Sequence, residues 1–201
     1  NYLDDQIEIF DISNPASPTS VALHTVGAGP ISLFTEGRYL YVVNEGTDNI
    51  SIVDVSNPRR PITVSTHPVG DTPQSIYASG RHVYVANNQG DSVSIIDVSN
   101  PSVPVTVATR AVGSEPFSVF VTGRYAYVAN SNANTLSILD VTNPANPVSV
   151  ATPTTGLVPL SVTVSGRYAY VANFGADTVS VFDISNPISP YIVSTISVQD
   201  R

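Results

Sequence analysis

The chain has 201 residues, 42% hydrophobic and only 12% charged, a balance that excludes an intrinsically disordered protein and fits one ordered domain. All eight basic residues are Arg, and the sixteen acidic residues give a formal net charge of -8, which argues against nucleic acid or an anionic membrane as the main partner. The lack of Cys excludes disulfides and thiolate metal sites, and no apolar run is long enough to predict membrane insertion.

The first 29 residues contain two strand-like segments, 6–12 and 19–26, on either side of an Asn-Pro turn. These segments match the third and fourth strands of the repeat that follows, so the leading unit lacks two inner strands. We therefore expect an incomplete ring, whose unpaired strand edge is open to self-association.

From residue 30 onward the sequence repeats every 43 residues without an insertion. Gly-Arg recurs at 37–38, 80–81, 123–124 and 166–167, and Asn-Pro at 14–15, 57–58, 100–101, 143–144 and 186–187. Each unit reads as four short strands rich in Val, Ile, Tyr and Thr, as at 161–165, 167–173, 178–184 and 191–197. This pattern predicts an all-β propeller of four-stranded antiparallel blades, with a half blade at 1–29 and full blades at 30–72, 73–115, 116–158 and 159–201.

A family resemblance lies in the stretch Gly166-Arg-Tyr-Ala-Tyr-Val-Ala-Asn173 and in the following Thr178-Val-Ser-Val-Phe-Asp-Ile-Ser-Asn-Pro187. It resembles the LVIVD repeat of bacterial and archaeal surface proteins and is similar to the YVTN propeller repeat. The resemblance extends over essentially the whole chain. It implies a propeller and an extracellular or cell-surface location, and it implies no activity.

Two charged positions recur in every full unit: Arg38, Arg81, Arg124 and Arg167 after the turn glycines, and Asp54, Asp97, Asp140 and Asp183 at the end of the third strand. The start of one strand lies beside the end of the next in a hairpin, so we expect Arg–Asp pairs within each blade. An anion site formed by the arginines is the alternative. The aspartates are expected to accept backbone N–H groups in turns, since a catalytic carboxylate seldom needs so many copies.

Neither a metal nor a cofactor is predicted. The loops between second and third strands carry Asp48, Asp91, Asn134 and Asp177, which could hold Ca²⁺, but they lack the Gly and terminal Glu of a calcium loop, and ordinary polar turns explain them better. His24 and His67 occupy one repeat position in neighbouring blades, too far apart to share an ion.

Catalytic motifs are missing, including Gly-x-Ser-x-Gly, His-Glu-x-x-His and the P-loop, so we predict that the chain is not an enzyme. The alternative is an enzyme with an acid-base site at the mouth of the central channel. Its candidates are the acids that break the repeat: Glu36, Glu45, Asp71 and Glu115.

The main functional hypothesis is a non-catalytic module that binds a protein or glycan in a secreted or cell-surface protein, with a structural spacer of a surface layer as a further alternative. The predicted partner site consists of apolar residues in the variable loops of the last blades: Phe117, Leu157, Val158, Leu160 and Phe174. Phe117 and Leu160 could instead point inward and plug the channel.

Overall fold

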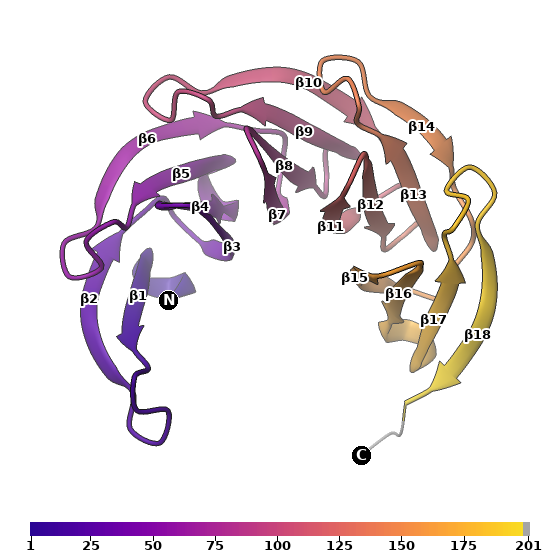
Figure 1. Cartoon of the computed structure of the whole chain (residues 1–201), viewed down its shortest axis with the longest axis horizontal. Coiled ribbons are helices and arrows are strands. Elements are labelled where there is room, and N and C mark those ends of the chain that lie inside the picture. Colours follow the sequence, from indigo (N-terminus) through magenta and orange to yellow (C-terminus); the bar gives the residue numbers. More distant parts are fainter. Residues whose placement is uncertain (199–201) are drawn as a thin grey trace.

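A computed structural model describes residues 1–198, and it consists of five antiparallel sheets in an arc around a central space (Figure 1). The first sheet has two strands and the other four have four strands each, always with sequence neighbours paired. The predicted all-β propeller of four-stranded blades is therefore confirmed. The last predicted blade, 159–201, ends outside the described residues.

The strands are β1 (Gln6–Asp11) and β2 (Thr19–Thr25) in the first sheet; β3 (Pro30–Glu36), β4 (Tyr39–Asn44), β5 (Asn49–Asp54) and β6 (Ile62–Pro68) in the second; β7 (Pro73–Ser79), β8 (His82–Asn87), β9 (Ser92–Asp97) and β10 (Val105–Ala111) in the third; β11 (Pro116–Thr122), β12 (Tyr125–Asn130), β13 (Thr135–Asp140) and β14 (Val148–Ala151) in the fourth; and β15 (Pro159–Ser165), β16 (Tyr168–Asn173), β17 (Thr178–Asp183) and β18 (Tyr191–Ser197) in the fifth. Short 3-10 helices are η1 (Tyr2–Asp4), η2 (Glu45–Thr47) and η3 (Phe174–Ala176). Within residues 1–198 no helix is long and apolar enough to cross a membrane.

Each innermost strand turns into the second strand through the repeated Gly-Arg sequence. Gly37, Gly80, Gly123 and Gly166 all have φ between 57° and 61°. Glycine adopts this left-handed conformation at low cost because it has no Cβ. The turn places Glu36 opposite Tyr39 and starts the second strand immediately after the Arg.

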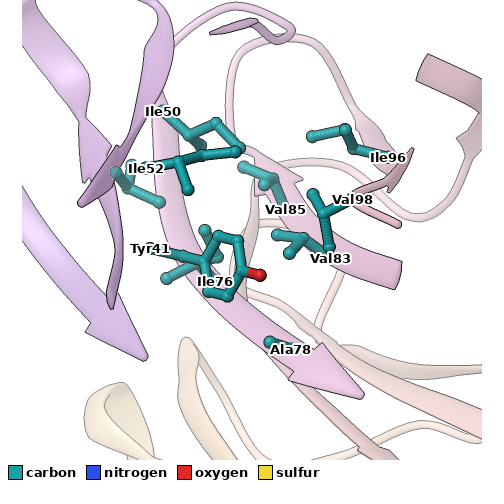
Figure 2. Packing of buried hydrophobic residues seen from close by; sticks show 10 residues of the cluster. Tyr41, Ile50, Ile52, Ile76, Ala78, Val83, Val85, Ile96 and Val98 are labelled. Atoms are coloured by element: carbon teal, nitrogen blue, oxygen red, sulfur yellow. The ribbon is translucent and has the colours of Figure 1, made fainter. Parts of the chain in front are cut away.

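The hydrophobic core lies between neighbouring blades. Tyr41, Ile50 and Ile52 of one blade pack against residues such as Ile76 and Val85 of the next, and all of them are buried (Figure 2). A second strand is covered on both faces in this arrangement, which explains why its sequence is apolar without alternation.

A buried Asn ends every second strand of the complete blades. Asn44, Asn87, Asn130 and Asn173 are at most 1% exposed. In each blade the Nδ2 donates a hydrogen bond to a Ser Oγ two residues into the third strand, at 2.9 Å. A glycine of the preceding loop packs against each Asn so closely that a Cβ there would lie 2.7 or 2.8 Å from the Asn side chain. The Asn–Gly contact thus fixes where the loop between two blades crosses the second strand.

Candidate functional site

The arc of sheets has two faces, one at each end of the strands, and different connections form each face. The loop face is formed by the connections between second and third strands and by those that join successive blades, which are residues 1–6, 26–30, 44–49, 69–73, 87–92, 112–116, 130–135, 155–159 and 173–178. The turn face is the opposite face of the arc, and it is formed by the Gly-Arg hairpins and the Asn-Pro turns.

A repeated backbone clamp holds the loop face together. The Oδ1 of Asp91 accepts a hydrogen bond from the backbone N–H of Glu115 at 2.8 Å. The same bond, at 2.7 to 2.9 Å, joins Asp5 to Gly29, Asp48 to Thr72 and Asn134 to Val158. Each residue on both sides of these bonds has a positive φ, between 45° and 64°. Three of the four loop residues considered as calcium ligands, Asp48, Asp91 and Asn134, are therefore occupied as clamps. No three His, Asp or Glu residues of the described chain are grouped as a metal ion would require.

Glu115 lies in a shallow depression between the third and fourth complete blades, with a volume of about 230 Å³. The depression is lined by Glu115, Ser131, Asn132, Asn134, Leu157, Val158 and Gly175. The carbonyl oxygen of Glu115 accepts hydrogen bonds from the N–H of Ser131 at 2.8 Å and from its Oγ at 2.9 Å. Its exposed carboxylate has one weak contact, with Ser131 Oγ at 3.5 Å. The backbone of Glu115 is thus fixed while its carboxylate stays available.

Three of the five predicted partner residues gather beside this depression. Leu157, Val158 and Phe174 are 57%, 38% and 72% exposed. Their loops are joined by hydrogen bonds from Phe174 N to Val158 O at 2.9 Å and from Gly175 N to Leu157 O at 3.0 Å.

The other two predicted partner residues lie elsewhere. Phe117 and Leu160 are half-buried at the second positions of the innermost strands β11 and β15, and neither lines the depression. The apolar surface available to a ligand is therefore the exposed set of three in the loops.

The four candidate acids do not converge at one mouth. Glu45 is on the loop face, but both of its oxygens are occupied, by the Tyr2 hydroxyl at 3.0 Å and by Gln74 Nε2 at 2.8 Å. The hydrogen bond to Glu45, and then its charge, raise the pKa of Tyr2. Asp71 is exposed on the same face.

Glu36 lies on the turn face, at the far end of β3. A seven-residue strand separates its ends by about 20 Å, so the expectation that Glu36 shares a site with the other three acids is wrong.

On the turn face, Arg38, Arg124 and Arg167 pair with Asp54, Asp140 and Asp183, at 3.3, 2.6 and 3.1 Å. Each of these guanidinium groups also stacks on the next Tyr ring, 5.0 or 5.1 Å from its centroid. Arg81 forms no such pair with Asp97, contrary to the prediction. The residue after Arg81 is His82, so the aromatic platform that orients the other three arginines is replaced by a smaller ring.

The aspartates that end the third strands act as turn acceptors. The N–H and Oγ of Ser185 donate to Asp183 Oδ1 at 2.9 and 2.6 Å. These hydrogen bonds, the side-chain one first, and the neighbouring Arg167 lower the pKa of Asp183. Hydrogen bonds from the same turn position also lower the pKa of Asp11, Asp54, Asp97 and Asp140.

These lowered pKa values predict the acid response of the fold. A carboxyl group whose pKa is lower in the folded state stabilises the protein above its unfolded pKa, about 3.9 for Asp, and this stability is lost as the pH falls through the folded value. We expect melting temperatures that are level from about pH 7 to 5 and fall below about pH 4. Asp183→Asn should melt lower than the wild type at pH 7, and the two curves should converge as the pH falls. Parallel curves down to pH 2 would contradict the assignment.

Larger depressions lie elsewhere on the described chain. One of about 670 Å³ on the outer rim contains Arg59 and Arg60, but its only carboxylate, Asp54, is occupied by the Ser56 N–H and by Arg38. Another, of about 620 Å³ and mainly apolar, lies beside β1 and β3. The imidazole of His24, which lines the first of these two depressions, is hydrogen-bonded to Thr63 Oγ1 at 2.8 Å.

Two family models match the sequence. One, described as a lactonase with a 7-bladed β-propeller, matches residues 5–122, and the LVIVD repeat matches residues 117–155 and 160–198. The predicted resemblance to the LVIVD repeat is thereby confirmed for the last two blades and not for the whole chain, and neither match supports the YVTN repeat. No curated protein matches the sequence.

Solved structures share the fold at low sequence identity. A protein from Bacteroides uniformis proposed to be a 6-phosphogluconolactonase has a TM-score of 0.87 and 14% identity, over 99% of this chain and 67% of its own. The periplasmic gluconolactonase of Pseudomonas aeruginosa has a TM-score of 0.84 and 17% identity, over 96% and 64%. A protein of unknown function from Desulfotomaculum acetoxidans has a TM-score of 0.83 and 19% identity, over 97% and 64%. The chain thus spans about two thirds of the length of these structures.

The predicted extracellular location and the protein or glycan partner stay predictions. The prediction that the chain is not an enzyme is wrong, because the model that matches residues 5–122 is that of an enzyme family. Since the matched residues are more than half of the 201, the chain belongs to the lactonase family with a 7-bladed β-propeller.

Proposed function

We propose that the protein hydrolyses a lactone ring in the depression at Glu115. The observation that carries the proposal is the available carboxylate of Glu115, held by its backbone among hydroxyl and amide groups and beside an apolar wall. Glu115 also lies within the residues that match the lactonase model. The acid-base enzyme considered as the alternative from the sequence is thereby preferred.

The chemistry needs one base and one group that stabilises negative charge. Glu115 takes a proton from a water molecule as the water oxygen attacks the lactone carbonyl carbon. The ring C–O bond then breaks, and the proton passes to the ring oxygen, which leaves as the hydroxyl of a hydroxy acid. The side-chain amide of Asn132, exposed at the rim, donates to the carbonyl oxygen as negative charge develops there.

The size and walls of the depression suit a small ring. Its volume of about 230 Å³ is below the roughly 300–1,000 Å³ of pockets for drug-sized ligands, so a monocyclic lactone fits better than an oligosaccharide. Leu157 and Val158 face the C–H groups of such a ring, and the polar side of the depression faces its carbonyl.

Acid release from glucono-δ-lactone in a pH-stat tests the proposal. We expect a saturable rate above spontaneous hydrolysis, lost when the protein is heat-denatured. A panel of five- and six-membered lactones extends the assay to related rings. If circular dichroism shows that the protein is folded and it accelerates the hydrolysis of none of these lactones, the proposal is wrong.

A further inference from the structure

The whole formal net charge of the chain is located on the loop face. This face carries eight acidic residues, which are Asp4, Asp5, Glu45, Asp48, Asp71, Asp91, Glu115 and Asp177. The other eight acids equal the eight arginines in number, so the remainder of the chain is neutral and the -8 equals the charge of the loop face. Asp200 and Arg201, outside the described residues, have opposite charges and do not change this balance.

No basic side chain belongs to the loop face within residues 1–198. Four arginines follow the hairpin glycines on the turn face, Arg59 and Arg60 lie in an Asn-Pro turn on the same face, and Arg110 lies in the outermost strand β10. Of the histidines, His24 and His67 lie in the outermost strands β2 and β6, and His82 begins β8 at the turn face. Within the described residues, the Glu115 carboxylate at the depression thus has no basic side chain of its own face beside it.

A negatively charged substrate is disfavoured at such a face. A phosphate ester carries a charge of about -1.5 to -2 at neutral pH and is held in proteins by Arg, Lys or clustered N–H donors. Here the N–H groups of Thr72, Glu115 and Val158, which point into the loops, already donate to the clamp side chains Asp48, Asp91 and Asn134. In the part of the chain that the structure describes, the loop face thus offers a phosphate no basic side chain, and these three N–H groups are already used.

We infer that the lactone hydrolysed at Glu115 carries no negative charge, as in an unphosphorylated aldonolactone. The inference rests on the proposed function and adds the substrate class. Fields of one sign change association rates by about 10- to 1,000-fold, so the charge of the substrate, more than its ring, decides the preference. The phosphate-bearing lactone is repelled before its carbonyl reaches the carboxylate.

The test compares glucono-δ-lactone with its 6-phosphate at two ionic strengths. At about 0.01 M salt, where the Debye length is about 30 Å, we expect kcat/KM to favour the neutral lactone by at least about 10-fold. At about 0.15 M, where the Debye length is about 8 Å, the preference should shrink because the phosphorylated substrate alone gains.

A charge-reversed variant separates the effect of the electrostatic field on substrate preference from the effect of the shape of the depression. Asp177→Arg changes the loop face near Gly175 without touching a residue of the proposed machinery. It should raise kcat/KM for the phosphorylated lactone several-fold at low salt and leave that for the neutral lactone unchanged. The matched control, Arg59→Glu on the turn face, should change neither value.

The outcomes distinguish the two proposals. If both lactones are hydrolysed and the phosphorylated one is equal or better at low salt, the inference on charge is overturned and the proposed function stands. If neither lactone is hydrolysed by the folded protein, both are overturned.

Discussion

Glu115→Gln is expected to lower kcat/KM for the neutral lactone by about 100- to 10,000-fold, the usual contribution of a positioned general base. Glutamine has the same shape but cannot accept the proton of the attacking water. The backbone of residue 115 remains held by Asp91 and Ser131, because these bonds involve its N–H and its carbonyl oxygen. The loss should therefore fall on kcat, with the melting temperature unchanged.

Glu45→Gln is the matched control for this variant. Glu45 is also a loop-face acid in the residues matched by the lactonase model, but its oxygens are bound by Tyr2 and Gln74. We expect its kcat/KM to stay within about threefold of the wild type, as for a residue outside the chemistry. An active Glu115→Gln together with an inactive Glu45→Gln would move the base to the junction at Glu45, two repeats earlier in the chain.

The fold could be predicted from the sequence because the turns, the strands and the charged pairs all recur with the same 43-residue period. The hairpin glycines, exemplified by Gly37, need a positive φ, and the second strands are apolar without alternation because blades cover both faces. The Arg–Asp pairs follow from hairpin geometry alone. The exception, Arg81, depends on the substitution of one stacking ring, which pairwise reasoning about charges does not include.

The site was less predictable, for two physical reasons. Glu115 is visible as an acid that breaks the repeat, but Ser131 and Asn132 look like ordinary turn residues until the loops of two blades are side by side. The clamp from Asp91 to Glu115 joins residues 24 apart, with no local motif to mark it. A lone carboxylate in a depression has no sequence signature, which is why the absence of motifs led to the wrong prediction of a non-catalytic module.

The signal that could have revealed the site is a difference between copies. Glu115 is the only acid at the positive-φ position of a loop between blades, and the buried Asn that follows it is succeeded by Ser131, which no other copy has at that position. The positions equivalent to Glu115 hold Gly29, Thr72 and Val158. All four copies have a positive φ at this position, whereas only one copy has a carboxylate there. A functional residue is therefore expected where the sequences of the repeats differ.

The buried Asn130 packs against Gly113 in the loop that leads to Glu115. Asn130→Ala is expected to lower the free energy of unfolding by about 2–4 kcal/mol. Its Nδ2 donates to Thr135 Oγ1 at 3.0 Å and to Ser137 Oγ at 2.9 Å. Truncation leaves Ser137 buried without this donor and opens a void against Gly113. Urea titration followed by circular dichroism gives the change in unfolding free energy. Asn143→Ala, at an exposed Asn of the Asn-Pro turn, is the control and should cost about 1 kcal/mol or less.

A double-mutant cycle with Gly113 tests the contact itself. A Cβ on Gly113 would lie 2.8 Å from the Asn130 side chain, so Gly113→Ala alone should cost about 1–3 kcal/mol through overpacking. In the Asn130→Ala background the same methyl group enters the vacated space, and its cost should disappear or reverse. The expected coupling energy is therefore more than about 1 kcal/mol, well above the roughly 0.5 kcal/mol scatter of independent sites. Additive effects would show that Asn130 and Gly113 do not support each other, and that the loop bearing Glu115 is held by its hydrogen bonds to Asp91 and Ser131 instead.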